Sequence, residues 1–136
     1  MKNLSLFLAV FLVLSSSCGT SGQNEKNTSS TKVQQGRIDI DVAEFKNKMK
    51  EKDIVILDVR TPAETAEGKI EGTIEIDVKA SGFEEKIKEL DKDKTYLVYC
   101  RSGRRSVTAC NILEKEGFKK TYNLLGGFNA WKTSSK

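Results

Sequence analysis

Short apolar runs alternate with amphipathic stretches from Arg37 to the end of the chain. The continuous apolar runs at 54–57 and 95–99 are typical of strands that are buried on both faces, as in a parallel sheet covered by helices. Residues 73–78 and 120–125 are two further strand candidates. The pattern predicts an α/β domain in which a central, mostly parallel sheet is flanked by helices.

The amphipathic stretches between the strand candidates predict helices, because their apolar residues recur at helical spacing and face one side. Asp41 stands where it can cap a helix that begins at residue 42, and Gly117 stands where it can end a helix over 106–115. The last predicted helix follows the turn at Gly126 and Gly127. The other predicted helices cover 42–50, 83–90 and 106–115.

The first residues are typical of an export signal. A basic start at Lys2 precedes an apolar run over 4–14 and small residues at 15–17, and this run is shorter than the roughly 20 residues of a membrane span. Cys18 directly after the small residues resembles the lipidated cysteine of a bacterial lipoprotein, with cleavage and plain secretion as the alternative. We therefore expect a protein of the cell envelope or periplasm, anchored to a membrane by lipid.

The stretch that follows Cys18 has a composition that does not fold. Residues 19–36 contain one strongly apolar residue, Val33, among serine, threonine, asparagine, glutamine and lysine. Such a segment cannot bury enough apolar surface to form a core. The expected organisation is a signal peptide over 1–17, a lipidated cysteine and flexible tether over 18–36, and one α/β domain over 37–136.

Composition excludes several kinds of chemistry. The chain has no histidine, which rules out a Ser-His-Asp triad, a cysteine–histidine pair and an imidazole metal ligand. Its three cysteines are too few for a four-thiolate zinc site, so no metal is expected. The net charge of +4 gives no global field that points to nucleic acid.

The most informative motif is Cys100-Arg101-Ser102-Gly103-Arg104-Arg105-Ser106, between strand 95–99 and helix 106–115. A thiol in this position is surrounded by backbone N–H groups, guanidinium groups and the start of a helix, and each of these stabilises a thiolate. The thiolate is the nucleophilic form of cysteine, so Cys100 is the candidate catalytic residue. This interpretation requires that solvent and substrate reach the sulfur.

The other loop residues are candidates for substrate binding. Backbone N–H groups from Arg101 to Ser106 can curl around the sulfur, while the three arginines attract a dianionic donor. Ser106 either caps the helix or donates a hydrogen bond to the sulfur, and capping is the better-founded alternative. Cys110 is expected in the core, with a redox partnership with Cys100 as the alternative.

Four motifs in order resemble the rhodanese-like (sulfurtransferase) domain family, over about residues 38–131. The first is Leu57-Asp58-Val59-Arg60 with Pro62 and Glu64. The others are Gly68-Lys69-Ile70-Glu71-Gly72, the Cys100 loop, and Leu124-Leu125-Gly126-Gly127 with Trp131.

The resemblance implies a three-layer fold with about five strands and a sulfurtransferase without a cofactor. In such an enzyme Cys100 attacks a sulfane donor such as thiosulfate, becomes a persulfide and passes the outer sulfur to a thiol or protein acceptor. Asp58, Arg60 and Glu64 are interpreted as a structural ion network.

Two alternative functions remain at this point. A cysteine phosphatase or arsenate-handling enzyme is disfavoured, because the phosphatase pattern places an arginine six positions after the cysteine, where this chain has Ser106. A non-catalytic or redox-relay binding module would use the same fold without needing sulfur transfer. The intact loop argues against that module.

Overall fold

The computed structural model describes residues 36–134. The expected signal peptide, Cys18 and every residue of the expected tether except Gly36 lie outside the described residues. Within 36–134, no helix combines the length and the apolar character that crossing a membrane would require.

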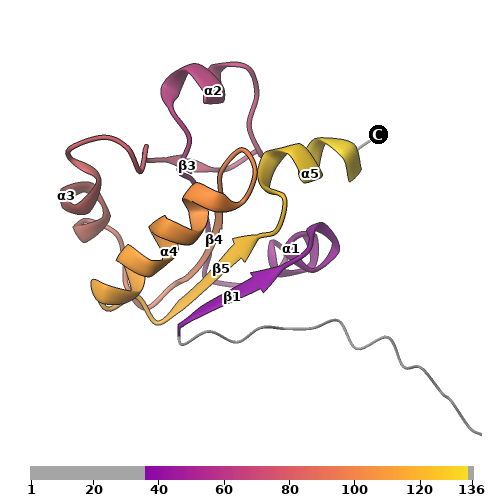
Figure 1. The fold of residues 1–136 in the computed structure, drawn as a ribbon. Helices are drawn as coiled ribbons and strands as arrows, with labels where there is room; N and C mark the ends of the chain where they lie inside the picture. Colours follow the sequence, from indigo (N-terminus) through magenta and orange to yellow (C-terminus); the bar gives the residue numbers. More distant parts are fainter. Residues whose placement is uncertain (1–35, 135–136) are drawn as a thin grey trace, which may run out of the picture.

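Five strands form one sheet in the order β1-β5-β4-β2-β3, and every neighbouring pair is parallel. Figure 1 shows the sheet at the centre of the domain with helices around it. The family resemblance predicted about five strands, and the purely parallel pairing confirms the α/β class. The strands are β1 (Arg37–Ile40), β2 (Ile54–Asp58), β3 (Ile74–Glu75), β4 (Thr95–Tyr99) and β5 (Lys120–Leu124).

Two apolar cores lie on the two faces of the sheet, because successive side chains of a strand point to opposite sides. In β4, Tyr96 and Val98 enter one core while Leu97 and Tyr99 enter the other. The first core is covered by α3 and α4, and the second by α1 and α5. The helices are α1 (Val42–Lys48), α2 (Pro62–Ala66), α3 (Phe83–Lys88), α4 (Arg104–Lys115) and α5 (Gly127–Ser134).

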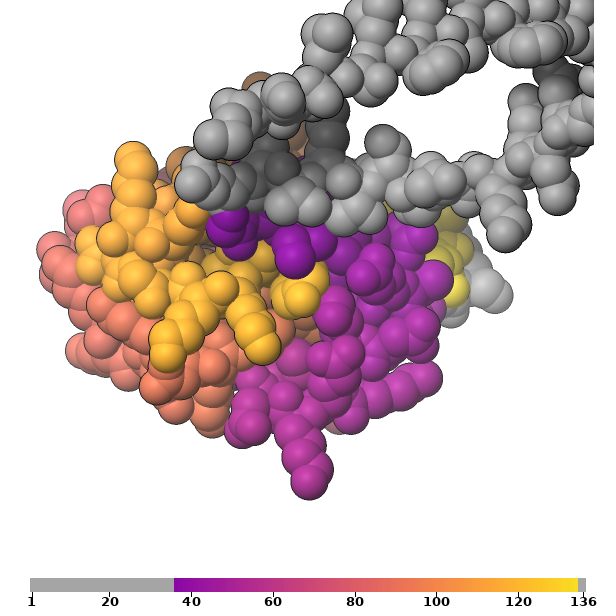
Figure 2. Space-filling view, turned by 90° about the horizontal axis from the view of Figure 1, so that it is seen from below, coloured from indigo at the N-terminus to yellow at the C-terminus, as the bar shows by residue number. Residues whose placement is uncertain are grey.

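Strand β1 was not identified by the hydrophobic pattern. Its sequence Arg-Ile-Asp-Ile has only two apolar residues, and it becomes a strand by pairing along its length with β5, where Ile40 lies opposite Leu124. Seen from below in Figure 2, the indigo start of the domain lies against the yellow-orange segment that includes β5.

The structure differs from the predicted elements at three places that bear on the site. The strand expected over 73–78 shrinks to the two exposed residues of β3. A short helix, α2, forms over a stretch for which no helix was predicted, and it is held by a capping box between Thr61 and Glu64. Helix α4 begins at Arg104 instead of Ser106, after Gly103, which adopts a φ of 90°. Ser106 therefore lies inside the first turn of α4 and does not cap it.

Candidate active site

The Cys100 loop lies at the carboxyl end of β4, where it leads into α4. The carboxyl ends of parallel strands meet at one edge of the sheet, and open α/β proteins bind their ligands there. Two hydrogen bonds from α5 fix the start of the loop: Phe128 N donates to Cys100 O at 2.8 Å, and Asn129 N donates to Arg101 O at 3.0 Å. The cysteine is therefore held by strand β4 on one side and helix α5 on the other.

The sulfur of Cys100 faces hydrogen-bond donors from its own loop. The backbone N–H of Gly103 donates to Sγ at 3.1 Å, and the hydroxyl of Ser106 donates to Sγ at 3.4 Å. This geometry confirms the expected curling of the loop around the thiol. It also resolves the two alternatives for Ser106, since its hydroxyl binds the sulfur.

These donors make the Cys100 thiol more acidic. Burial is the strongest single influence on its pKa and raises it, since a buried thiolate loses hydration. Hydrogen bonds from the Ser106 hydroxyl and from the N–H groups of Ser106, Ser102 and Gly103 act in the opposite direction. Together they outweigh burial and hold the pKa of Cys100 below its ordinary value of 9.0.

The Cys100 side chain has no exposed surface, with a relative accessibility of 0%. The thiol is thus covered in this conformation, whereas the sequence interpretation required an open one. The thiol is covered because its sulfur faces donors of its own loop and because Cys100 packs in the core that α3 and α4 cover. Arg101 and Ser102, the next two residues of the loop, are exposed.

The three arginines of the loop occupy different environments. Arg105 forms a two-pronged ion pair with Glu64 of α2, with N···O distances of 2.7 and 2.6 Å. Arg101 and Arg104 are exposed, and no carboxylate within 36–134 forms an ion pair with either. All three arginines, with Ser102, Thr108 and Lys79, line a cavity of about 380 Å³ beside the loop.

The expected ion network is present with one change of partner. Asp58 and Arg60 form a buried ion pair at 2.6 Å, and the Arg60 guanidinium lies 4.1 Å from the Phe128 ring centre. The Glu64 carboxylate accepts hydrogen bonds from Arg105, whereas the only Glu64 atom to which Arg60 donates is the backbone oxygen. The network thus joins β2 and α2 directly to the start of α4.

Cys110 is a core residue, as predicted. It is fully buried among apolar side chains of the α4 face, and burial raises the pKa of its thiol to about 12. Both Cys100 and Cys110 are free thiols.

Lys79 is the residue that sequence reasoning missed. It lies in the connection between β3 and α3, about 20 positions before the loop that it approaches. No local pattern distinguishes it from the other exposed lysines, because its place at the cavity depends on the fold. Within 36–134, no group of three or more histidine, cysteine, aspartate or glutamate residues gathers in a metal-binding arrangement.

Comparisons with known proteins agree with this geometry. The model of the rhodanese-like domain family matches residues 41–134. YtwF of Bacillus subtilis is 39% identical over 99 residues, which span 72% of this chain and 93% of YtwF. The thiosulfate sulfurtransferase GlpE of Coxiella burnetii is 37% identical over 84 residues, which span 62% of this chain and 77% of GlpE.

A solved structure shows the same fold. The crystal structure of a rhodanese-related protein from Thermoplasma volcanium has a TM-score of 0.62 and 33% sequence identity, over 71% of this chain and 91% of that one. The covered fraction includes most of the residues that the structure describes. The chain therefore belongs to the rhodanese-like domain family.

Proposed function

We propose that this protein is a sulfurtransferase that carries sulfane sulfur on Cys100 as a persulfide. The observation that carries the proposal is the Cys100 sulfur, which accepts hydrogen bonds from Gly103 N–H and the Ser106 hydroxyl at the start of α4. These donors favour the thiolate, which is the nucleophilic form. Relatives named as sulfurtransferases support the same class of reaction.

The proposed reaction has two steps. The Cys100 thiolate attacks the outer sulfur of a donor such as thiosulfate, so that a new sulfur–sulfur bond forms and the donor's own sulfur–sulfur bond breaks. Sulfite leaves with the bonding electron pair. A nucleophilic acceptor, such as a small thiol or a protein thiol, then attacks the outer sulfur of the persulfide and releases the Cys100 thiolate.

The loop contributes to both steps through the same groups. The N–H groups of Ser102, Gly103 and Ser106 stabilise negative charge at the sulfur before attack and after release of the product. Exposed Arg101 and Arg104 attract an anionic donor. No group other than the donor and the acceptor is needed to balance the bonds.

The reaction requires the covered sulfur to become accessible. Ser102 is the natural place for this opening, because it is exposed, whereas Cys100 and Arg101 on one side of it are bound to α5 and Gly103 on the other is buried. A conformation with an open loop is therefore part of the proposal.

The decisive experiment incubates the purified protein with thiosulfate and measures the intact mass before and after. A gain of one sulfur atom on Cys100, lost again on adding a thiol acceptor, is the expected result. Cys100→Ser must show neither the adduct nor turnover, while Cys110→Ser retains both. A wild-type protein that gains no sulfur from thiosulfate or another sulfane donor contradicts the proposal, and a non-catalytic binding role then becomes the better interpretation.

We also propose that the protein is exported and lipidated on Cys18, on the basis of the sequence of its first 18 residues. The test is metabolic labelling with a fatty acid, followed by separation of membrane and soluble fractions. Label on the wild-type protein and its loss in Cys18→Ser are expected. An unlabelled protein in the soluble exported fraction favours plain secretion instead.

A further inference from the structure

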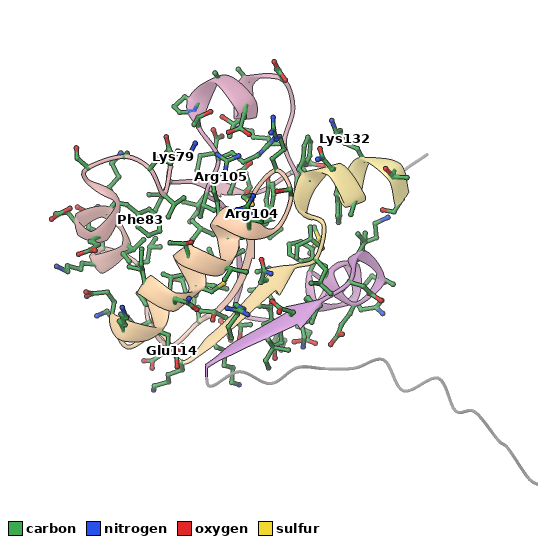
Figure 3. The ribbon with its side chains drawn as sticks, viewed as in Figure 1. Lys79, Phe83, Arg104, Arg105, Glu114 and Lys132 are labelled. Carbon is green, nitrogen blue, oxygen red and sulfur yellow. The ribbon has the colours of Figure 1, made fainter. Side chains whose placement is uncertain are left out.

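One cavity beside the Cys100 loop is lined by positive charge. It has a volume of about 380 Å³ and is bordered by Arg101, Ser102, Arg104 and Arg105 of the loop and α4, by Thr108 and by Lys79. No carboxylate is among these lining residues. In Figure 3, Lys79 lies on the connection before α3 while Arg104 and Arg105 lie at the start of α4, so the cations come from two separate parts of the chain.

The backbone that carries Lys79 is fixed by hydrogen bonds from Val78 and from Lys79 itself. Val78 N donates to Val59 O at 3.3 Å, and Lys79 N donates to the Asp77 carboxylate at 2.8 Å. Ile76 and Val78 pack into the α4-face core on either side of Asp77. The lysine is therefore anchored at its Cα, while its side chain is exposed at the cavity.

Arg105 contributes less charge to the cavity than its position suggests. Both of its terminal nitrogens bind the Glu64 carboxylate, and this pairing raises the pKa of Arg105 and lowers that of Glu64 to about 2. The negative charge of Asp77 also raises the pKa of Arg105. Among the described residues, Lys79 forms no ion pair with a carboxylate, and the same holds for Arg101 and Arg104.

We propose that Lys79 is a specificity-determining residue that, with Arg101 and Arg104, binds the anionic end of the sulfur donor and selects dianions over singly charged or neutral donors. The kinetic effect of this inference rests on the proposed function, whereas the binding of an anion in the cavity does not depend on it. The Coulomb energy scales with the product of the charges, so three cations around one cavity favour a dianion over a singly charged anion by more than one cation alone does. The selection thus comes from a residue outside the active loop.

The test compares Lys79→Gln with Lys52→Gln, a matched control. Lys52 is an exposed lysine in the turn before β2, at the opposite end of the sheet, so both variants lose one surface charge. With thiosulfate as donor, Lys79→Gln is expected to raise KM by about three- to tenfold with little change in kcat. With a singly charged thiosulfonate the rise in KM is expected to be smaller, and Lys52→Gln leaves both values unchanged.

A binding measurement separates this inference from the proposed function. Sulfate is a dianion without a transferable sulfur, and it should slow alkylation of Cys100 by iodoacetamide by occupying the cavity. Lys79→Gln should need severalfold more sulfate for the same protection, at constant ionic strength. If wild type and Lys79→Gln give the same protection curve and the same KM, the inference is wrong. If sulfate protection depends on Lys79 while no donor transfers sulfur, the anion site stands and the proposed function fails.

Discussion

The two described cysteines show how position decides the chemistry of one residue type. Cys100 ends a strand and accepts hydrogen bonds from Gly103 and Ser106, and the pKa of its thiol lies below 9.0. Cys110 lies ten positions later within α4, and burial raises the pKa of its thiol to about 12. Burial acts on both thiols, but only the first faces several N–H donors.

This difference predicts selective alkylation. Since only the thiolate reacts, the rate for Cys100 should rise with pH and reach half of its maximum below pH 9, whereas Cys110 in the folded protein should stay nearly inert up to pH 9. Mass spectrometry of peptides after timed iodoacetamide treatment measures both rates in one sample. Equal rates for the two cysteines would mean that the loop does not activate the thiol, and an inert Cys100 would contradict either its activation or the opening of the loop.

The Glu64–Arg105 pair gives a second prediction at this scale. The pKa of Glu64 is lowered from 4.5 to about 2, chiefly by hydrogen bonds from Arg105. A carboxylate with a lowered pKa stabilises the folded state above its unfolded pKa, and this contribution is lost as pH falls from about 4.5 towards 2. We expect Glu64→Gln to lower the free energy of unfolding at pH 7 by about 1–3 kcal/mol.

The expected pH dependence makes the test specific. The gap in stability between wild type and Glu64→Gln should narrow as pH falls below about 4.5, which urea unfolding at several pH values measures. Glu67→Gln is the control, because Glu67 is the exposed residue at the C-terminal end of the same helix and forms no ion pair within the described part of the chain. A constant gap across the pH range would show that the ion pair is not responsible.

At the scale of elements, α5 positions the active loop through its first residues. Gly127 adopts a φ of 57°, and a Cβ at this residue would lie 2.3 Å from Cys100 O and 2.8 Å from Gly103 N. The helix can therefore approach the loop only because this residue has no side chain. The close approach brings Phe128 N within 2.8 Å of Cys100 O.

Gly127→Ala is expected to displace the loop. The clash adds to the cost of a left-handed backbone, so we expect a loss of about 2–4 kcal/mol in the free energy of unfolding together with most of the sulfur transfer. Gly72→Ala is the matched control, since Gly72 has a similar φ of 74° and no atom within 4 Å of an added Cβ. It should lose about 1 kcal/mol and keep its activity. Equal losses in both variants would contradict the role of close packing at Gly127.

At the scale of the whole molecule, residues 36–134 supply both cores that the structure describes. Within that range, the apolar side chains of the two cores lie between Ile38 and Trp131. A chain that begins at Gly36 should therefore keep the unfolding temperature and the transfer rate of the full chain. A chain that ends at Gly126 should unfold, because it lacks Phe128 and Trp131 of the second core. Calorimetry of the three chains measures this, and a marked destabilisation of the first truncation would show that earlier residues belong to the folded unit.

The hydrophobic pattern predicted the buried strands best. Strand β4 has the predicted bounds, and β2 is longer than predicted by one residue. A continuous apolar run needs burial on both faces, so it forms a central strand of the sheet. The edge strand β1 was missed, and the edge strand β3 is shorter than predicted. They are short, and neighbouring strands define them more than their own residues do.

The sequence alone determined the α/β class, the junction between β4 and α4 that holds Cys100, and the length of the loop that turns N–H groups towards its sulfur. Tertiary structure decided that Arg105 pairs with Glu64, that Lys79 joins the cavity and that the thiol is covered. The physical reason is range. Backbone conformation follows from neighbours a few residues apart, whereas the Glu64–Arg105 pair joins residues 41 positions apart, and only the packed fold brings such residues together.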